Sequence, residues 1–210
     1  MPRDEPTLVE RYEVELVRAS FSPSAESAAE LVAALSAPLA RHRVLALRGL
    51  VRRALMTDGR WRAALEDQNA DVRRDALEQL AHAPSLSDEL VDRVVATLAD
   101  DDDLVVDAAA FALGEHHVGA AVAPLCRVAT DHEDARCRES AIAALGAIGD
   151  DRARATIIHA LDDKPPVRRR AIVALANFDG PDIDAALERA SEDRDWQVRS
   201  AVAQLRDDED

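Results

Sequence analysis

The stretch that decides the fold reads Asp71-Val72-Arg73-Arg74-Asp75-Ala76-Leu77-Glu78-Gln79-Leu80. Its apolar residues fall at positions i, i+4, i+5 and i+8, which places them on one face of an α-helix. The same register recurs in Pro166-Val167-Arg168-Arg169-Arg170-Ala171-Ile172-Val173-Ala174-Leu175 and in Cys137-Arg138-Glu139-Ser140-Ala141-Ile142-Ala143-Ala144-Leu145-Gly146. The pattern predicts helices whose small alanine lets a neighbouring helix come close, with leucine filling the space beyond it.

This helix is one copy of a repeat that extends along most of the chain. An Ala followed four residues later by a Leu recurs, and successive leucines lie 30, 33, 32, 30 and 30 residues apart. The pairs are Ala46/Leu50, Ala76/Leu80, Ala109/Leu113, Ala141/Leu145, Ala171/Leu175 and Ala201/Leu205. We call these the B helices. Such regular spacing is the sequence signature of a repeat architecture.

A second amphipathic stretch precedes each B helix, and we call it the A helix. Four examples are residues 88–98, 119–129, 153–161 and 183–190. Glycine-containing turns separate the hairpins, and no window alternates with period two, so we expect no strands. A hairpin of thirty residues cannot bury its own apolar face, and stacking on its neighbours is therefore required. The sequence predicts an all-α solenoid of about six helical hairpins.

The pattern Asp-x-x-x-x-Val-Arg-x-x-Ala-x-x-x-Leu, repeated about every 31 residues, resembles the HEAT repeats of the phycobilin-lyase (PBS) subclass. The first repeat departs from it at Arg41-His42-Arg43, the third has Val106 in place of the arginine, and the last is one residue short. The resemblance implies right-handed stacking and binding of another macromolecule along the surface formed by the B helices. We expect a capping helix and linker over residues 1–24, the HEAT-like solenoid over 25–206, and an acidic tail over 207–210.

The strongly negative net charge of the chain excludes some classes of binding partner. The chain has 41 Asp and Glu against 26 Lys and Arg, a net charge of −15, and Lys164 is its only lysine. A surface this acidic repels nucleic acids and anionic membranes, so we expect neither as a partner. The composition resembles that of proteins from salt-accumulating halophilic microbes. A GC-rich genome would also favour arginine over lysine, but it would not by itself supply so many carboxylates.

The remaining composition favours a cytoplasmic location. No apolar run approaches the roughly 18 residues of a membrane-spanning helix. The first residues, Met1-Pro2-Arg3-Asp4-Glu5, lack the charged-then-apolar order of a signal peptide. Two cysteines, Cys126 and Cys137, are too few for a disulfide framework in a chain of this length.

Aspartates concentrate between the A and B helices, and an arginine follows three of them by six residues. The pairs are Asp67 and Arg73, Asp162 and Arg168, and Asp193 and Arg199. We expect a structural ladder, in which each arginine ties adjacent loops together while the aspartate also caps the B helix. A binding role for these arginines is the alternative.

One segment is basic in this acidic chain. Residues 31–57 contain no acidic residue but five arginines, of which Arg41, Arg48 and Arg52 align along one stripe of the first B helix. A second basic cluster opens the fifth B helix. These arginines either neutralise the protein's own acidic loops or bind an acidic or phosphorylated partner through bidentate contacts. Under the second interpretation the binding residues are Arg41, Arg43, Arg48, Arg52, Arg168 and Arg169.

The enzymes among HEAT-like proteins offer a weaker match. Deoxyhypusine hydroxylases carry paired His-Glu motifs on B helices, whereas the one such dipeptide here, His132-Glu133, is expected in a loop. The Glu115-His116-His117 segment should lie at the opposite edge from His132, about 16 Å away along a helix of eleven residues, so the two cannot share an ion. We therefore expect no catalytic residue, no metal and no cofactor.

Taken together, these observations predict a non-catalytic scaffold or adaptor that binds one or more proteins through its B helices. A signalling or motility complex is one specific setting for such an adaptor. The alternative is a phycobilin-lyase-like or other HEAT-type enzyme subunit.

Overall fold

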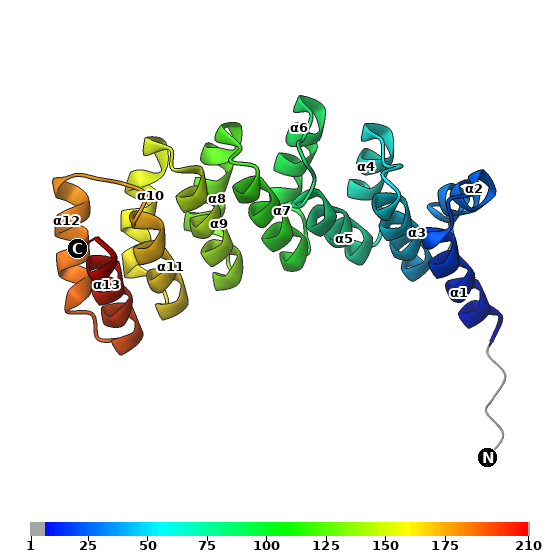
Figure 1. Cartoon of the computed structure of the whole chain (residues 1–210). Helices are drawn as coiled ribbons and strands as arrows, with labels where there is room; N and C mark the ends of the chain where they lie inside the picture. Colours follow the sequence, from blue (N-terminus) through cyan, green and yellow to red (C-terminus); the bar gives the residue numbers. More distant parts are fainter. Residues whose placement is uncertain (1–6, 210) are drawn as a thin grey trace, which may run out of the picture. The chain divides into compact units, whose positions relative to one another are not determined.

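The structure is a computed structural model that describes residues 7–209 of the 210-residue chain, with side chains for residues 7–206. Residues 1–6, which include the segment weighed against a signal peptide, and residue 210 lie outside the described residues. The described chain forms 13 α-helices and four short 3₁₀ helices and contains no strand (Figure 1). It divides into two compact units, residues 1–80 and 81–210.

The first unit consists of one extra helix followed by two hairpins. Its helices are α1 (Leu8–Phe21), α2 (Ala25–Ala34), α3 (Ala40–Arg52), α4 (Asp58–Leu65) and α5 (Ala70–Leu80). Helix α1 begins with a capping box, in which the Thr7 hydroxyl accepts from the Glu10 amide while the Glu10 carboxylate accepts from the Thr7 amide. It packs against α2 and α3.

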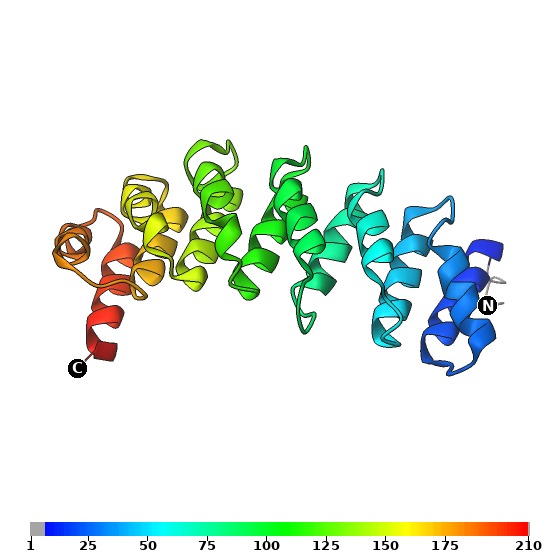
Figure 2. The same cartoon turned by 90° about the horizontal axis from the view of Figure 1, so that it is seen from above.

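The second unit consists of four hairpins. Its A-helix segments are α6 (Asp88–Ala96) with η1 (Thr97–Ala99), η2 (Gly119–Ala121) with α8 (Val122–Asp131), η3 (Asp151–Ala153) with α10 (Arg154–His159) and η4 (Ala160–Asp162), and α12 (Pro181–Ser191). Its B helices are α7 (Asp103–Glu115), α9 (Ala135–Ile148), α11 (Pro165–Leu175) and α13 (Trp196–Glu209). The A and B helices of this unit form two layers (Figures 1 and 2).

The predicted fold of six helical hairpins with an extra N-terminal helix is confirmed, and the repeated pairs form its core. The Ala and Leu of the first five pairs are all completely buried, from Ala46 and Leu50 to Ala171 and Leu175. Consecutive B helices pack on one another within each unit, α3 on α5 in the first and α7, α9, α11 and α13 in the second. Within each unit, each hairpin thus covers the apolar face of the next.

The register predicted for the last B helix is wrong by one residue. In α13 the expected pair, Ala201 and Leu205, is only half-buried. Val198 and Val202 are the buried residues there, spaced i, i+4 like Val72 and Ala76 of α5. Helix α13 also continues through residues 207–209, which we had expected to form a tail.

Glycines mark the closest approach between B helices of the second unit. A Cβ on Gly146 of α9 would lie 2.6 Å from the Cβ and 2.8 Å from the Cα of Ala174 on α11. A Cβ on Gly114 of α7 would lie 2.9 Å from the Cα of Ala144 on α9. Because these contacts involve the backbone of the neighbouring helix, no side chain fits at either position.

This close approach reverses the usual effect of a glycine-to-alanine substitution. In an exposed helix, alanine is more stable than glycine by about 1 kcal/mol. We expect Gly146→Ala to lower the free energy of unfolding by about 1–3 kcal/mol, as overpacking does, because α11 must move away. Gly59→Ala is the control, since nothing lies within 4 Å of its added Cβ; it should be neutral or stabilising. Urea unfolding of both variants measures the difference, and a neutral Gly146→Ala would contradict the packing described here.

Candidate protein-binding surface

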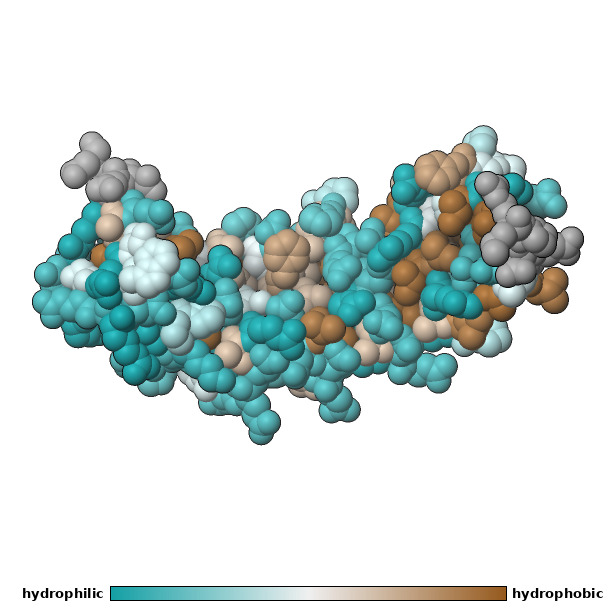
Figure 3. All heavy atoms as spheres, turned by 90° about the horizontal axis from the view of Figure 1, so that it is seen from below, coloured by the Kyte–Doolittle hydropathy of each residue, from teal (hydrophilic) through white to brown (hydrophobic). Residues whose placement is uncertain are grey.

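A groove of about 320 Å³ opens on the exposed side of three B helices of the second unit. Helix α7 contributes Phe111 and Glu115, α9 contributes Glu139 and Ala143, and α11 contributes Arg170. Over this unit the face seen in Figure 3 is mostly hydrophilic, with small hydrophobic patches. The groove is therefore a limited apolar site in polar surroundings.

Phe111 is the large apolar side chain of this groove. It lies six residues after the first buried valine of α7, and the equivalent position of α9 holds Ala143, so the ring stands beside a small residue. The side chain is 47% exposed although its neighbours Ala110 and Ala112 are fully buried. Its ring meets the imidazole of His82 edge-on, with centroids 6.3 Å apart. An exposed aromatic side chain beside a groove is typical of an anchor for a binding partner.

The rim of the groove carries both signs of charge. Glu115 and Glu139 supply carboxylates, and a guanidinium nitrogen of Arg170, Nη2, lies 3.5 Å from Oε1 of Glu139. The Nε atom of Arg170 is buried and makes no hydrogen bond. The Arg170 side chain as a whole is 42% exposed, so other guanidinium nitrogens remain available to a carbonyl or carboxylate of a bound chain.

Buried arginines tie consecutive hairpins together, and we call each such contact a rung. In a rung, Nε and Nη2 of the arginine donate to the carboxylate of an aspartate in the next hairpin's turn, while Nη1 donates to carbonyls of its own turn. The donor–acceptor distances to the carboxylate oxygens run from 2.6 to 2.9 Å. The rungs are Arg43 to Asp67, Arg138 to Asp163, and Arg168 to Asp193.

The ladder predicted from sequence differs from these rungs in its pairing. Arg73 and Arg199 donate at 2.7 Å to the main-chain carbonyls of Asp67 and Asp193, the aspartates six residues before them. The carboxylates of those aspartates bind the arginine of the preceding hairpin instead. The acidic residue of the middle rung is Asp163 rather than Asp162, and Arg138 is a rung residue that the sequence analysis missed.

Two of the arginines considered for partner binding are unavailable for it. Arg43 is 6% exposed and Arg168 is 4% exposed. Their forks are occupied by Asp67 and Asp193, and their remaining nitrogens bind turn carbonyls. As partner-binding residues these two predictions are wrong, because a buried guanidinium with its donors satisfied cannot reach another protein.

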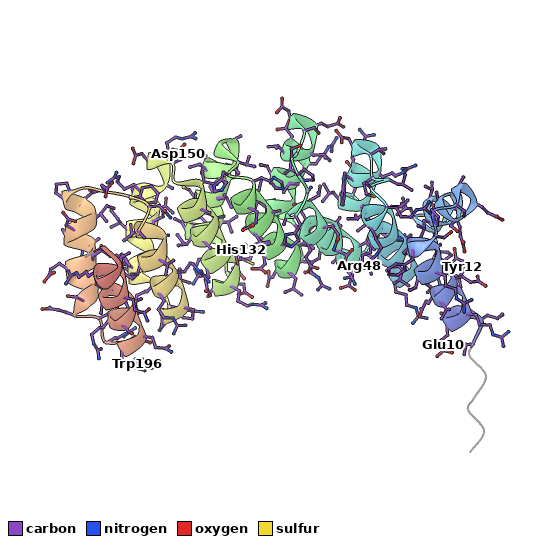
Figure 4. All side chains as sticks on the ribbon, viewed as in Figure 1. Glu10, Tyr12, Arg48, His132, Asp150 and Trp196 are labelled. Atoms are coloured by element: carbon purple, nitrogen blue, oxygen red, sulfur yellow. The ribbon has the colours of Figure 1, made fainter. Side chains whose placement is uncertain are left out.

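The other basic side chains keep an exposed surface. Arg41 is 60% exposed and pairs with Glu13 at 2.7 Å, and Arg48 (Figure 4) is 55% exposed and pairs with the buried Asp75 at 2.5 Å. The guanidinium of Arg52 stacks over the ring of Phe21, 4.4 Å from its centroid. Arg169 hydrogen-bonds to Gln197. Each of these residues thus has an intramolecular partner.

Two further features were missed by sequence reasoning. Trp196, at the start of α13, is 66% exposed (Figure 4). Asp103, His132 and Cys137 each offer a metal-ligand atom within 4.8 Å of one another. Burial above all, and then the nearby carboxylate of Asp103, raises the pKa of the Cys137 thiol to about 12. These three residues come from two successive repeats, with Asp103 at the start of α7 and Cys137 in α9, so their spacing in the sequence does not show that they meet.

The paired helices and the repeated buried Ala–Leu register define a helical-repeat protein of the α-solenoid class. The family model described as HEAT repeats matches residues 59–146, 88–176 and 122–205. These overlapping matches cover more than half of the chain, which therefore belongs to the HEAT-repeat family.

Solved structures with similar folds include natural and engineered repeat proteins. YibA of Escherichia coli is 17% identical with a TM-score of 0.61, over 96% of this chain and 75% of its own. An engineered protein is 21% identical with a TM-score of 0.60, over 85% and 94%. A designed armadillo repeat protein in complex with the peptide (KR)4 is 16% identical with a TM-score of 0.57, over 92% and 97%. At these identities the likeness shows the fold alone. No curated protein matches the chain.

Among the described residues, none of the helices combines the length and the apolar composition that a membrane span needs.

The rung between Arg138 and Asp163 gives a prediction for stability and its pH dependence. Hydrogen bonds from Arg138 lower the pKa of Asp163 below its ordinary value near 3.8. Its contribution to stability is therefore present above that value and lost as the pH falls through the lower native pKa. We expect Asp163→Asn to cost about 3 kcal/mol at neutral pH, because Arg138 loses its charge partner in a mostly buried site.

Urea unfolding at several pH values measures both effects. Between neutral and acidic pH the wild type should lose more stability than Asp163→Asn, since the variant has already lost the rung. Asp162→Asn is the matched control: it makes the same change one residue away, at an exposed side chain outside the rung, and should behave like wild type. Equal losses in the Asp162 and Asp163 variants would reject the assignment.

Proposed function

We propose that the chain is a protein-binding scaffold whose main binding surface is the exposed side of the B helices. HEAT and armadillo-like repeats commonly mediate protein binding, and this chain belongs to the first group. The observation that carries the proposal is the groove across α7, α9 and α11, with half-exposed Phe111 beside Ala143. Covering an aromatic ring that is otherwise partly in water gives a partner a favourable apolar contact.

The rim of the groove favours a particular kind of segment. Glu115 and Glu139 attract a cation, while the exposed part of the Arg170 guanidinium suits a main-chain carbonyl. We infer that the groove takes a polypeptide segment with an apolar side chain next to lysine or arginine. The designed armadillo neighbour, which binds a peptide of alternating lysine and arginine, is a precedent for basic ligands on this type of fold.

Photo-crosslinking tests this surface directly. A photoreactive amino acid at Ala143 lies in the groove on α9, whereas the same group at Ala123 lies exposed on α8, on the A-helix layer. Partner proteins in a native lysate should crosslink at position 143 and not at 123, and Phe111→Ala should weaken their binding at least about 30-fold, as the loss of a hot-spot side chain does. Equal crosslinking at both positions, or unchanged binding by Phe111→Ala, would reject the groove as the binding surface.

A peptide array measures the charge preference separately. Peptides with one apolar residue flanked by lysine or arginine should bind better than peptides with aspartate or glutamate at those places. A preference for the acidic peptides would contradict the role given to Glu115 and Glu139, without contradicting the groove itself.

We also propose a second contact, for an acidic or phosphorylated partner, at the exposed arginines of the first unit. With Arg43 buried, the proposal rests on Arg41, Arg48 and Arg52. Each holds its intramolecular partner through part of its guanidinium, so donors remain for a carboxylate or phosphate. The three charges are exposed in a segment without acidic residues, in a chain of net charge −15.

Arg52 gives the cleanest test of this second contact. Arg48→Glu would place a new carboxylate beside the buried Asp75 and destabilise the unit, so a loss of binding could not be interpreted. Arg52→Glu removes a cation–π contact with exposed Phe21 and a favourable charge in the last turn of α3, so the free energy of unfolding should fall only by about 1 kcal/mol. It should lower affinity for a phosphopeptide about tenfold or more. Arg127→Glu, at an exposed position on α8, is the control and should bind like wild type. Equal affinities of wild type and Arg52→Glu would refute this contact.

Catalysis is the alternative class of function. We propose that the chain is non-catalytic and that the phycobilin-lyase type of repeat, which its Val-Arg and Ala-Leu spacing favours, does not extend to a bound chromophore. The purified protein separates the classes, because a coloured protein or one with stoichiometric iron would favour an enzyme subunit.

A further inference from the structure

The ladder of rungs is interrupted at one junction in the second unit. In every B helix except α7, a buried residue in the first turn is followed at once by an arginine; Val72 precedes Arg73, Cys137 precedes Arg138, and Val167 precedes Arg168. In α7 the corresponding pair is Val105 and Val106, and both are completely buried. Helix α7 therefore has no arginine to offer to the next hairpin.

The acceptor side of the same junction is changed as well. The Nη1 atoms of Arg73 and Arg199 donate to the carbonyls of Asp67 and Asp193, and Arg138 donates in the same way, at 2.7 Å, to the carbonyl of His132. His132 thus occupies the position in its turn that those aspartates occupy in theirs. The arginine and the aspartate of a rung are both replaced at this one place, the first by Val106 and the second by His132.

A third departure from the repeat lies beside these two. Cys137 stands where α5, α11 and α13 have Val72, Val167 and Val198, and like them it is buried. Its thiol lies 3.2 Å from the main-chain carbonyl of Asp103, the first residue of α7. His132 (Figure 4) is at the end of the preceding A helix, and its Nε2 lies 3.9 Å from Oδ1 of Asp103.

We propose that Asp103, His132 and Cys137 bind a thiophilic divalent ion of the zinc class, which joins α7 to the next hairpin in place of the missing rung. Carboxylate oxygen, imidazole nitrogen and thiolate sulfur are the ligands that Zn²⁺ takes, at about 2.0–2.3 Å. In a tetrahedral site such ligand atoms lie roughly 3.5 Å apart. The three ligand atoms here lie within 4.8 Å of one another. Side-chain rotations that move these atoms by about one ångström would bring them to the spacing of a tetrahedral site.

Binding requires local changes at Cys137 and at His132. Burial raises the pKa of the Cys137 thiol to about 12, and the thiol donates to the Asp103 carbonyl at 3.2 Å, so the charge of the ion must offset the loss of the proton and of this hydrogen bond. The Cys137 thiol gives its proton to solvent as the sulfur becomes a ligand, since thiolate is the metal-binding form. The Nδ1 of His132 now accepts from the amide of Asp134 at a long 3.2 Å, and Nε2 faces Asp103. Binding through Nε2 places the ring proton on Nδ1, so this weak hydrogen bond is lost. A water molecule would complete the coordination from the exposed side of Asp103.

Titration with Co²⁺, a spectroscopic substitute for Zn²⁺, tests the site in the intact chain. We expect one equivalent to produce d–d bands and a sulfur-to-cobalt charge-transfer band, and Zn²⁺ to abolish both. Cys137→Val should eliminate the charge-transfer band, and it is a safe substitution because valine occupies this position in four other B helices. His132→Gln and Asp103→Asn should each weaken metal binding tenfold or more.

Two controls distinguish this site from adventitious binding. Cys126→Ser changes the other cysteine and should leave the spectrum unchanged. Zn²⁺ should raise the thermal midpoint of the wild type and of Cys126→Ser but not of Cys137→Val. The proposal is overturned if Co²⁺ gives no charge-transfer band, if that band survives in Cys137→Val, or if His132→Gln binds the ion as tightly as wild type.

Discussion

The contact between successive B helices is the constraint on which the rest of the molecule depends. With aromatic residues at 3% of the chain, the core is made from Ala, Leu and Val, and small residues must allow close helix approach. Gly146 against Ala174 is the clearest example, because the backbone of α11 occupies the space that a side chain would need. This spacing fixes which positions of a B helix face a neighbour and which face outward. Phe111 is exposed because it lies on the outward side of a helix whose inner side is filled by alanines.

The same spacing brings the turns of consecutive hairpins within reach of one arginine side chain. An arginine fork matches a carboxylate bidentately and has a further donor for a carbonyl, so one buried residue can satisfy two turns at once. Arg168 does this with Asp193 and the carbonyl of Asp163. In a chain with an excess of carboxylates, several arginines are thereby committed to the interior. Arg41, Arg48 and Arg52 keep exposed guanidinium groups and lie together in a segment without acidic residues.

Helix pairs and core could be predicted because they follow from local spacing, which a single sequence displays. For the rungs, the sequence predicts that arginine and aspartate side chains tie the turns together, but not which arginine binds which aspartate. Asp67 and Arg73 are six residues apart and look like partners, but the carboxylate binds Arg43, 24 residues away, because stacking rather than sequence distance decides the neighbour. The last helix was misread since Ala201 and Leu205 imitate the repeat, while Val198 and Val202 carry the buried face. Phe111 was overlooked because an apolar residue within an apolar helix gives no sign in the sequence of facing outward.

At the interrupted rung, the arginine and the aspartate are replaced together rather than singly. An exchange of one partner alone would leave a buried charge without its counterpart, which costs several kcal/mol. Val106 and His132 avoid that cost together, since one removes the cation and the other the anion. If the rung had simply been replaced by apolar packing, we would expect a second apolar residue opposite Val106 rather than His132. Apolar packing does not account for the imidazole of His132, which lies beside a thiol and a carboxylate. In each rung of the described chain, this position in the turn holds an aspartate that binds an arginine of the preceding hairpin. A divalent cation bound by Asp103, His132 and Cys137 would supply the positive charge that an arginine supplies in each rung. The three departures from the repeat, at Val106, His132 and Cys137, then have a single explanation.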